Sequence, residues 1–306
     1  MNYDVKLINN SEGKGRIELD RMGFLAKHIK GIAQKTLLLQ LFGYSKVKMP
    51  RNLHRYLDIF LTQTQEGDGD TILTLDAESF KNIPIQLNLF TEKEALKDLT
   101  PMALVIKSFT AALSDDADKN MIDEPLLDEL LQFKNFFNSD LEKILLSNRK
   151  TIPEIEFSKK EIEKVKSLYK SIPLPKKQVV AGVIDEMKYS KEQVILTTSD
   201  SKKVIVIVAK DLLSQLKEFF GRDISITGMA HYKPGGNLSY IQLESFGEPG
   251  KAGHFLSRRP DQLTTNQQIA IQLSQGKKKN PLDDIFGKWP GNESDEEFEQ
   301  MMKALD

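Results

Sequence analysis

Cysteine and histidine, which provide many nucleophiles and metal ligands, are absent or scattered in this sequence. The chain has 306 residues, no cysteine and four histidines, which stand far apart at His28, His54, His231 and His254. Without cysteine, disulfides, thiolate metal ligands and thiol nucleophiles are excluded. Because metal-binding histidines recur at short fixed spacings, these four predict no metal site.

The sequence also lacks the motifs that mark common enzymes. It contains no phosphate-binding P-loop, no nucleophile elbow, no dinucleotide fingerprint and no zinc-protease helix motif. The glycines from Gly228 to Gly236 fall between expected strands, where they indicate turns and bulges. We therefore expect no catalytic residues, no cofactor and no enzymatic activity.

One acidic turn has alternating acidic residues and glycines, as a calcium loop can have. Glu66, Asp68 and Asp70 alternate with glycines between two strand-like runs, 56–62 and 71–75. A calcium loop of the EF-hand type needs about twelve residues and a terminal bidentate glutamate. The segment has neither, so we interpret it as the turn of an antiparallel hairpin.

The strongest binding pattern lies at the end of the chain, in residues 281–306. Ser294 and Glu297 have the spacing of a helix capping box, and apolar residues follow at helical spacing. Aromatic and methionine side chains provide much of the energy of protein interfaces. The expected partner-binding residues are Phe286, Trp289, Phe298, Met301, Met302 and Leu305. The alternative is a tail that folds back on its own chain.

Within this tail, residues 286–297 resemble a known terminal segment. They are similar to the F-G-x-W-P-G-D-E-T-D-E-E segment of small bacterial antitoxin-like proteins, which are often paired with PIN-domain ribonuclease toxins. The sequence departs from it at Asn292 and Ser294, and both replacements keep a capping side chain. The resemblance implies that the tail binds a toxin and obstructs its acidic metal site, with the lysines at 277–279 approaching the toxin's carboxylates. Typical members also have an N-terminal DNA-binding module, of which this sequence has no clear version.

Residues 177–248 predict a small OB-like β-barrel. β-Branched and alternating runs predict five strands, at 179–185, 193–198, 203–208, 224–230 and 238–244. An amphipathic run at 211–220, ended by Gly221, predicts a helix after the third strand. The order βββαββ is that of an OB-type barrel, with an SH3-like barrel as the alternative.

An OB-like barrel raises the possibility of nucleic-acid binding. Such barrels hold single strands with stacking aromatic residues and a basic groove. The residues available for this are Lys188, Tyr189, Tyr232, Lys233 and Tyr240. The alternative for Tyr232 and Tyr240 is packing across a hairpin. With 43 basic and 44 acidic residues, the chain has no global field for a polyanion, so any such binding must be local.

Residues 1–150 predict an α+β domain. It begins with a strand at 3–9 and a long helix at 17–42 that Gly43 ends, on which His28 and Lys30 are expected to face solvent. Thr100 and Pro101 predict the start of a later helix after a first capping box at 91–94, and another helix is expected at 125–133. These elements gather no catalytic group of side chains.

The remaining segments connect or extend the two domains. Residues 151–176 predict a helical linker with a capping box at Ser158 and Glu161, and 249–280 form a basic linker. No run is long and apolar enough for a membrane span, and the start resembles no signal peptide. We expect a cytoplasmic protein with no membrane partner.

The sequence thus predicts an α+β fold: an N-terminal α+β domain, a small OB-like barrel and a flexible C-terminal tail with an amphipathic helix. The first functional hypothesis is a non-enzymatic, antitoxin-like protein that neutralises a toxin or nuclease through its tail. The alternative is a nucleic-acid-binding accessory protein that acts through its barrel.

Overall fold

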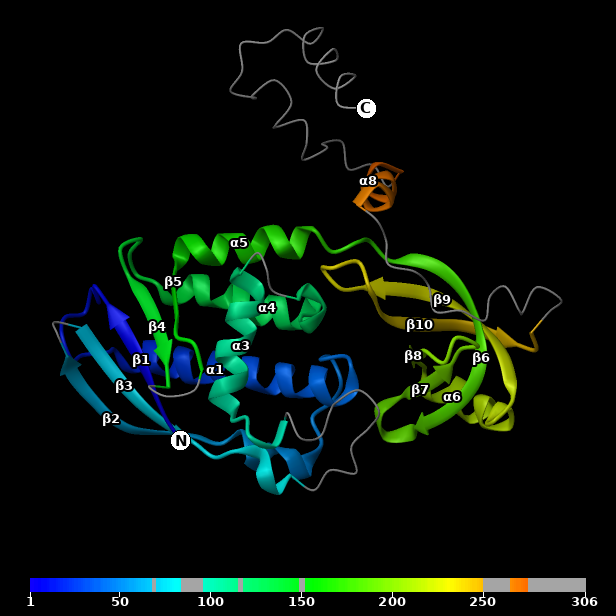
Figure 1. Ribbon diagram of the computed structural model, residues 1–306, viewed down its shortest axis with the longest axis horizontal. Helices are drawn as coiled ribbons and strands as arrows, with labels where there is room; N and C mark the ends of the chain where they lie inside the picture. The colour runs from blue at the N-terminus through cyan, green and yellow to red at the C-terminus, as the bar shows by residue number, and fades with distance from the viewer. Residues whose placement is uncertain (68–69, 84–95, 115–117, 149–151, 250–264, 275–306) are drawn as a thin grey trace, which may run out of the picture. The chain divides into compact units, whose positions relative to one another are not determined.

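The computed structural model describes residues 1–67, 70–83, 96–114, 118–148, 152–249 and 265–274 (Figure 1). The chain divides into two units, Met1–Leu263 and Thr264–Asp306. The first unit holds a five-stranded sheet with its helices and a closed five-stranded barrel. The described part of the second unit is the helix α8, Thr265–Ser274. The fold is therefore α+β, with the barrel that the sequence predicted.

The sheet of the N-terminal part is antiparallel and has the strand order β2-β3-β1-β4-β5. Its first strand lies in the middle, because the hairpin β2–β3 pairs on one side of it and the later strand β4 on the other. The strands are β1 Asn2–Ile8, β2 Ile59–Gly67, β3 Asp70–Ala77, β4 Lys143–Ser147 and β5 Ile155–Ser158. The predicted hairpin is confirmed.

Four helices share one apolar core with this sheet. They are α1 Leu19–Phe42, α3 Pro101–Leu113, α4 Glu124–Gln132 and α5 Lys159–Lys170. Short 3₁₀ turns connect the elements at Arg51–Leu57, Phe80–Asn82, Lys119–Met121 and Phe133–Phe136. Phe109, Phe133 and Phe157 are almost fully buried and contact one another at the centre of this core.

The helix boundaries follow the predicted capping chemistry. Gly43 ends α1 with φ of 72° and donates its N–H to the carbonyl of Leu39. Thr100 caps α3 by accepting the N–H of Ala103 at 3.1 Å, and Ser158 and Glu161 form the predicted capping box. The capping box predicted at 91–94 lies outside the described residues.

One prediction on α1 is wrong. His28 is buried, with 7% of its surface exposed, and its Nδ1 lies 2.6 Å from Oε1 of Glu129 on α4. Gly31, one turn later on α1, leaves the room for this carboxylate, since a Cβ there would lie 2.6 Å from the same oxygen. The Glu129 side chain comes from a distant part of the chain, so the α1 pattern alone gives no sign of it.

The barrel has the five predicted strands and the predicted helix. Its elements are β6 Lys176–Lys188, β7 Gln193–Thr197, β8 Lys203–Ile207, α6 Lys210–Leu216, β9 Asp223–Tyr232 and β10 Leu238–Gly247, with 3₁₀ turns at Tyr189–Lys191 and Lys217–Phe219. The strands close in the order β10-β8-β7-β6-β9. β10 pairs parallel with β8, and the other pairs are antiparallel.

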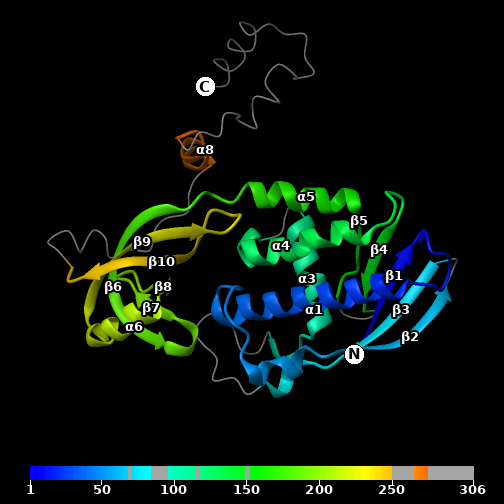
Figure 2. The ribbon, with the colours of Figure 1, turned by 180° about the vertical axis from the view of Figure 1, so that it is seen from behind.

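The segment expected as a helical linker, 151–176, contributes both β5 and α5. β5 forms an edge of the N-terminal sheet, and Ile162 and Val165 of α5 are fully buried in the same core. The chain then enters the barrel through β6 (Figures 1 and 2).

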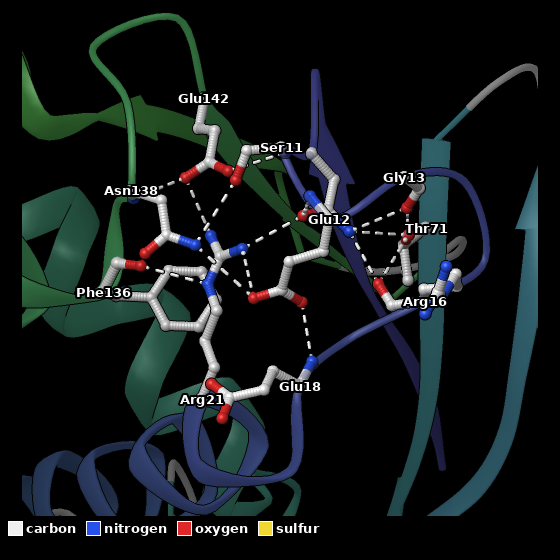
Figure 3. Close-up of polar contacts among 11 residues, drawn as sticks. Ser11, Glu12, Gly13, Arg16, Glu18, Arg21, Thr71, Phe136, Asn138 and Glu142 are labelled. Carbon is white, nitrogen blue, oxygen red and sulfur yellow. Dashed lines mark hydrogen bonds and ion pairs between the residues drawn. The ribbon is translucent and has the colours of Figure 1, made fainter.

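A buried ionic network fixes the long connection between β1 and α1 (Figure 3). Arg21 donates from Nη2 to Oε2 of Glu142 at 2.8 Å and from Nε to the carbonyl of Phe136 at 3.1 Å. Its guanidinium also lies over the Phe136 ring, 4.3 Å from the centroid. Glu142 accepts two backbone N–H groups as well, from Ser11 and Asn138, each at 2.8 Å. Every group in this network has a partner, so we interpret it as structural.

Candidate functional site

A cavity of about 320 Å³ lies where the barrel contacts the helices of the N-terminal part. Its lining comes from α1 and the residues after it, from the start of α4, and from the facing strands β9 and β10. Both ribbon views place the β9–β10 hairpin beside α4 (Figures 1 and 2). The cavity therefore joins segments more than a hundred residues apart in the sequence.

Hydrogen bonds fix the walls of this cavity. Asp123 caps α4 and accepts the N–H of Leu126 at 3.2 Å, and it also accepts the N–H and the hydroxyl of Ser45 at 2.7 and 2.6 Å. On the barrel side, Lys233 donates to the carbonyl of Asn120 at 2.8 Å, and Asn237 donates to the side chain of the same residue. The hairpin is thus tied to the turn before α4.

One wall is aromatic. The His231 and Tyr240 rings stack with centroids 4.4 Å apart and planes 8° apart, and Tyr44 packs on Tyr240 at 4.2 Å. Burial and a hydrogen bond with Tyr240 raise the pKa of Tyr44 far above its ordinary value. Burial also lowers the pKa of His231, and this effect, with a smaller one from Lys46, outweighs the opposite effect of Glu124. Because an ordinary histidine pKa is near 6.5, His231 is neutral at pH 7.

The opposite wall is acidic. Glu124 and Asp128 lie one turn apart on α4 and are both exposed at the rim. Glu124 accepts the Tyr169 hydroxyl at 3.0 Å, which together with burial raises the pKa of that tyrosine to about 12. Burial and the neighbouring Glu124 raise the pKa of Asp128. Among the described residues, the Asp128 carboxylate forms no hydrogen bond or ion pair.

Two lysines and a serine complete the polar lining. Lys35 is engaged elsewhere, with the carbonyl of Pro125 at 3.1 Å and the Glu129 carboxylate at 3.0 Å, whereas Lys46 is exposed. Ser239 lies at the irregularity where the β9–β10 register shifts, between Leu238 and Tyr240. It is 6% exposed, and in the described part of the chain its hydroxyl has no hydrogen-bond partner.

The residues predicted for nucleic-acid binding lie in two places rather than one groove. Tyr232, Lys233 and Tyr240 are at the cavity or its hairpin, where Tyr232 is 3% exposed and Lys233 is bonded to Asn120. The register places Tyr232 opposite Leu238 and Tyr240 opposite His231.

The other two predicted residues are at the turn between β6 and β7. Lys188 pairs with Glu186 at 2.8 Å, and Tyr189 is 62% exposed. This turn contacts the end of α1, since the ammonium group of Lys191 lies 3.2 Å from the centroid of the Phe42 ring. Burial lowers the pKa of Lys191 to about 8.

Several residues of the cavity were not predicted. Asp123 and Pro125 have the types that begin a helix, so they could have marked the start of α4 one residue earlier. Tyr44, Glu124, Asp128 and Ser239 carry no local signal, because they meet only through tertiary packing. The predicted partner-binding residues Phe286, Trp289, Phe298, Met301, Met302 and Leu305 lie outside the described residues.

Two other kinds of feature are absent from the described part of the chain. There, no group of three or more histidine, cysteine, aspartate or glutamate residues could hold a metal ion. Nor does any helix in the described ranges have the length and apolar character to cross a membrane. In comparisons with known proteins, no family model, no curated protein and no solved structure matches this chain.

Proposed function

We propose that the chain is a non-enzymatic, antitoxin-like protein whose segment 281–306 binds and neutralises a partner toxin or nuclease. The aromatic and methionine residues of a segment whose sequence predicts a capped, acidic helix support the proposal. An acidic first turn also favours helix formation when the segment binds, because it complements the helix dipole.

The observation that carries this proposal is the helical spacing of Phe298, Met301, Met302 and Leu305, and the closure of the barrel is consistent with it. β10 pairs with both β9 and β8, so all five strands have two neighbours. A closed barrel offers no free strand edge that an additional segment of the chain could complete. This excludes strand addition to the barrel as a binding mode of the tail.

We propose further that the barrel is OB-like. The helix between the third and fourth strands and the parallel pairing of β8 with β10 support this assignment. In the antitoxin-like function, the barrel and the N-terminal part serve as a scaffold.

The proposal is tested by co-purification with the product of the adjacent gene, using the full-length chain. Trp289→Ala and the pair Met301→Ala with Met302→Ala should each reduce recovery of the partner at least tenfold, because buried anchors dominate interface energies. Lys303→Ala is the matched control, since Lys303 lies off the apolar stripe. Equal recovery by all variants would exclude the tail as the binding element.

A second function, single-strand nucleic-acid binding, is favoured by one observation at the β6–β7 turn. Tyr189 is 62% exposed, which suits stacking on a base, while Lys188 and Lys191 beside it are engaged with Glu186 and the Phe42 ring. Fluorescence anisotropy with labelled single strands should then show salt-dependent binding that Tyr189→Ala weakens. An absence of binding at low salt would eliminate this function, because phosphate contacts are strongest there.

A further inference from the structure

We propose that the cavity between α4 and the β9–β10 hairpin binds an organic cation, that is, an ammonium or guanidinium group. This inference concerns the first unit alone and is independent of the proposed partner binding by the tail. It rests on the charges at the rim, the aromatic wall and a buried hydroxyl.

The charges at the rim select a cation. Glu124 and Asp128 present two carboxylates one turn apart, and Asp128 has no ion pair among the described residues. Asp123 is not counted, because capping α4 and binding Ser45 already account for it. Lys35 pairs with Glu129 at 3.0 Å and its charge also acts on Asp128, and Lys46 is the second positive charge at the lining. A cation beside Asp128 would relieve the repulsion between the two carboxylates.

The aromatic wall provides the second feature of a cation site. The rings of Tyr44, Tyr240 and His231 pack on one another and form a water-excluding wall. The attraction between a carboxylate and a cation is stronger where water is excluded. Because His231 is neutral at pH 7, it adds no positive charge that would repel such a ligand.

Ser239 provides a third feature of the site, a buried hydroxyl that could bind a ligand. Buried hydroxyl groups are nearly always hydrogen-bonded, and an unmade bond costs about 1–3 kcal/mol. Ser239 is 6% exposed, lines this cavity, and its hydroxyl has no partner in the described ranges. An N–H group of a bound ammonium or guanidinium ion could donate to it.

The size of the cavity suits a small ligand. Its volume of about 320 Å³ is at the lower end of the roughly 300–1,000 Å³ typical of ligand pockets. Two sources present this chemistry, a free amine and the side chain of an arginine or lysine in a peptide. The cavity recognises the cationic group that both sources share, and titration with one probe of each kind distinguishes the two.

Titration calorimetry on the full-length chain tests the site, with agmatine as the free cation and the tripeptide Gly-Arg-Gly as the peptide source. We expect saturable binding of at least one of them and none of butyrate, which has a carboxylate in place of the cation. The tighter of the two probes identifies the source. Binding of neither cation, or equal binding of butyrate, would overturn the proposal.

Variants place the binding in this cavity. Asp128→Asn should weaken the affinity for the bound probe about tenfold, since a charge-assisted hydrogen bond is lost, and Ser239→Ala should weaken it less. Asp140→Asn is the matched control, because Asp140 is an exposed aspartate that pairs with Lys159 and does not line the cavity. Asp128 is at the exposed rim, so its substitution should leave the melting temperature nearly unchanged. Unaltered affinity in Asp128→Asn would contradict the assignment.

Discussion

Arg21 and Glu142 are both buried, with 7% and 2% of their surfaces exposed, and they form an ion pair, while Arg21 also pairs with Glu12 at 3.3 Å. A buried ion pair adds little net stability relative to apolar residues, but the loss of one member leaves an uncompensated charge. This residue pair holds the β1–α1 connection in place (Figure 3). It therefore matters for stability rather than for binding.

We predict that Glu142→Gln destabilises the protein by about 2–3 kcal/mol, because Arg21 loses its nearest counter-charge and keeps only the longer ion pair with Glu12 at 3.3 Å. Glu163→Gln is the matched control, since Glu163 pairs with Lys134 at a half-exposed site and should cost less than about 1 kcal/mol. Urea denaturation of the two variants measures the difference. Equal midpoints would show that the network contributes nothing specific.

The same carboxylate predicts acid sensitivity. Burial alone would raise the pKa of Glu142, but hydrogen bonds from Ser11 and Asn138 and the charge of Arg21 outweigh it and lower the pKa below its ordinary value of 4.5. The unfolded chain then binds the proton more tightly than the folded one. The stability from this group is present above about pH 4.5 and is lost as the pH falls through the folded-state pKa.

Denaturation midpoints measured between neutral pH and pH 3 check this expectation. The midpoint of the parent protein should fall more steeply below pH 4.5 than that of Glu142→Gln, which has no carboxylate to protonate. Parallel curves would assign the acid sensitivity to other groups.

At the scale of elements, the barrel depends on close approaches between strands at glycines, and the tightest is at Gly228. A Cβ on Gly228 of β9 would lie 2.1 Å from the carbonyl oxygen of Gln242 on β10. Because backbone cannot yield as a flexible side chain does, this position tolerates only glycine.

We predict that Gly228→Ala destabilises the barrel by about 2 kcal/mol or more, since the two strands must separate to admit the methyl group. Gly247→Ala at the end of β10 is the control, because nothing lies within 4 Å of its added Cβ. Thermal melting compares the two. A melting temperature in Gly228→Ala equal to that of the control would refute the account.

Most elements could be predicted from the sequence, because their signals are local. Alternating β-branched residues identified the five barrel strands, and Gly43, Thr100 and Ser158 marked helix ends through their capping chemistry. The burial of His28 could not be predicted, because its partner Glu129 comes from another helix. The same applies to Ser239, whose position depends on a register shift between strands.

At the scale of the whole molecule, the cavity could not be predicted at all. The sequence identified Tyr232, Lys233 and Tyr240 as residues of interest but gave no sign that α4 lies against their hairpin. The Glu124 and Asp128 carboxylates therefore line the same cavity although no local pattern predicts it. Their negative charges make this surface unsuitable for a phosphate. The packing of the N-terminal part against the barrel determines which charged side chains line the cavity.

The central claim, that segment 281–306 neutralises a toxic partner, is tested most directly by a growth assay. The product of the adjacent gene is expressed with the full-length chain, with Trp289→Ala or with the control Lys303→Ala. We predict that the full-length chain and the control restore growth, while Trp289→Ala does not, because it removes the central aromatic anchor. Full protection by Trp289→Ala, or none by the full-length chain against a toxic neighbour, would contradict the claim.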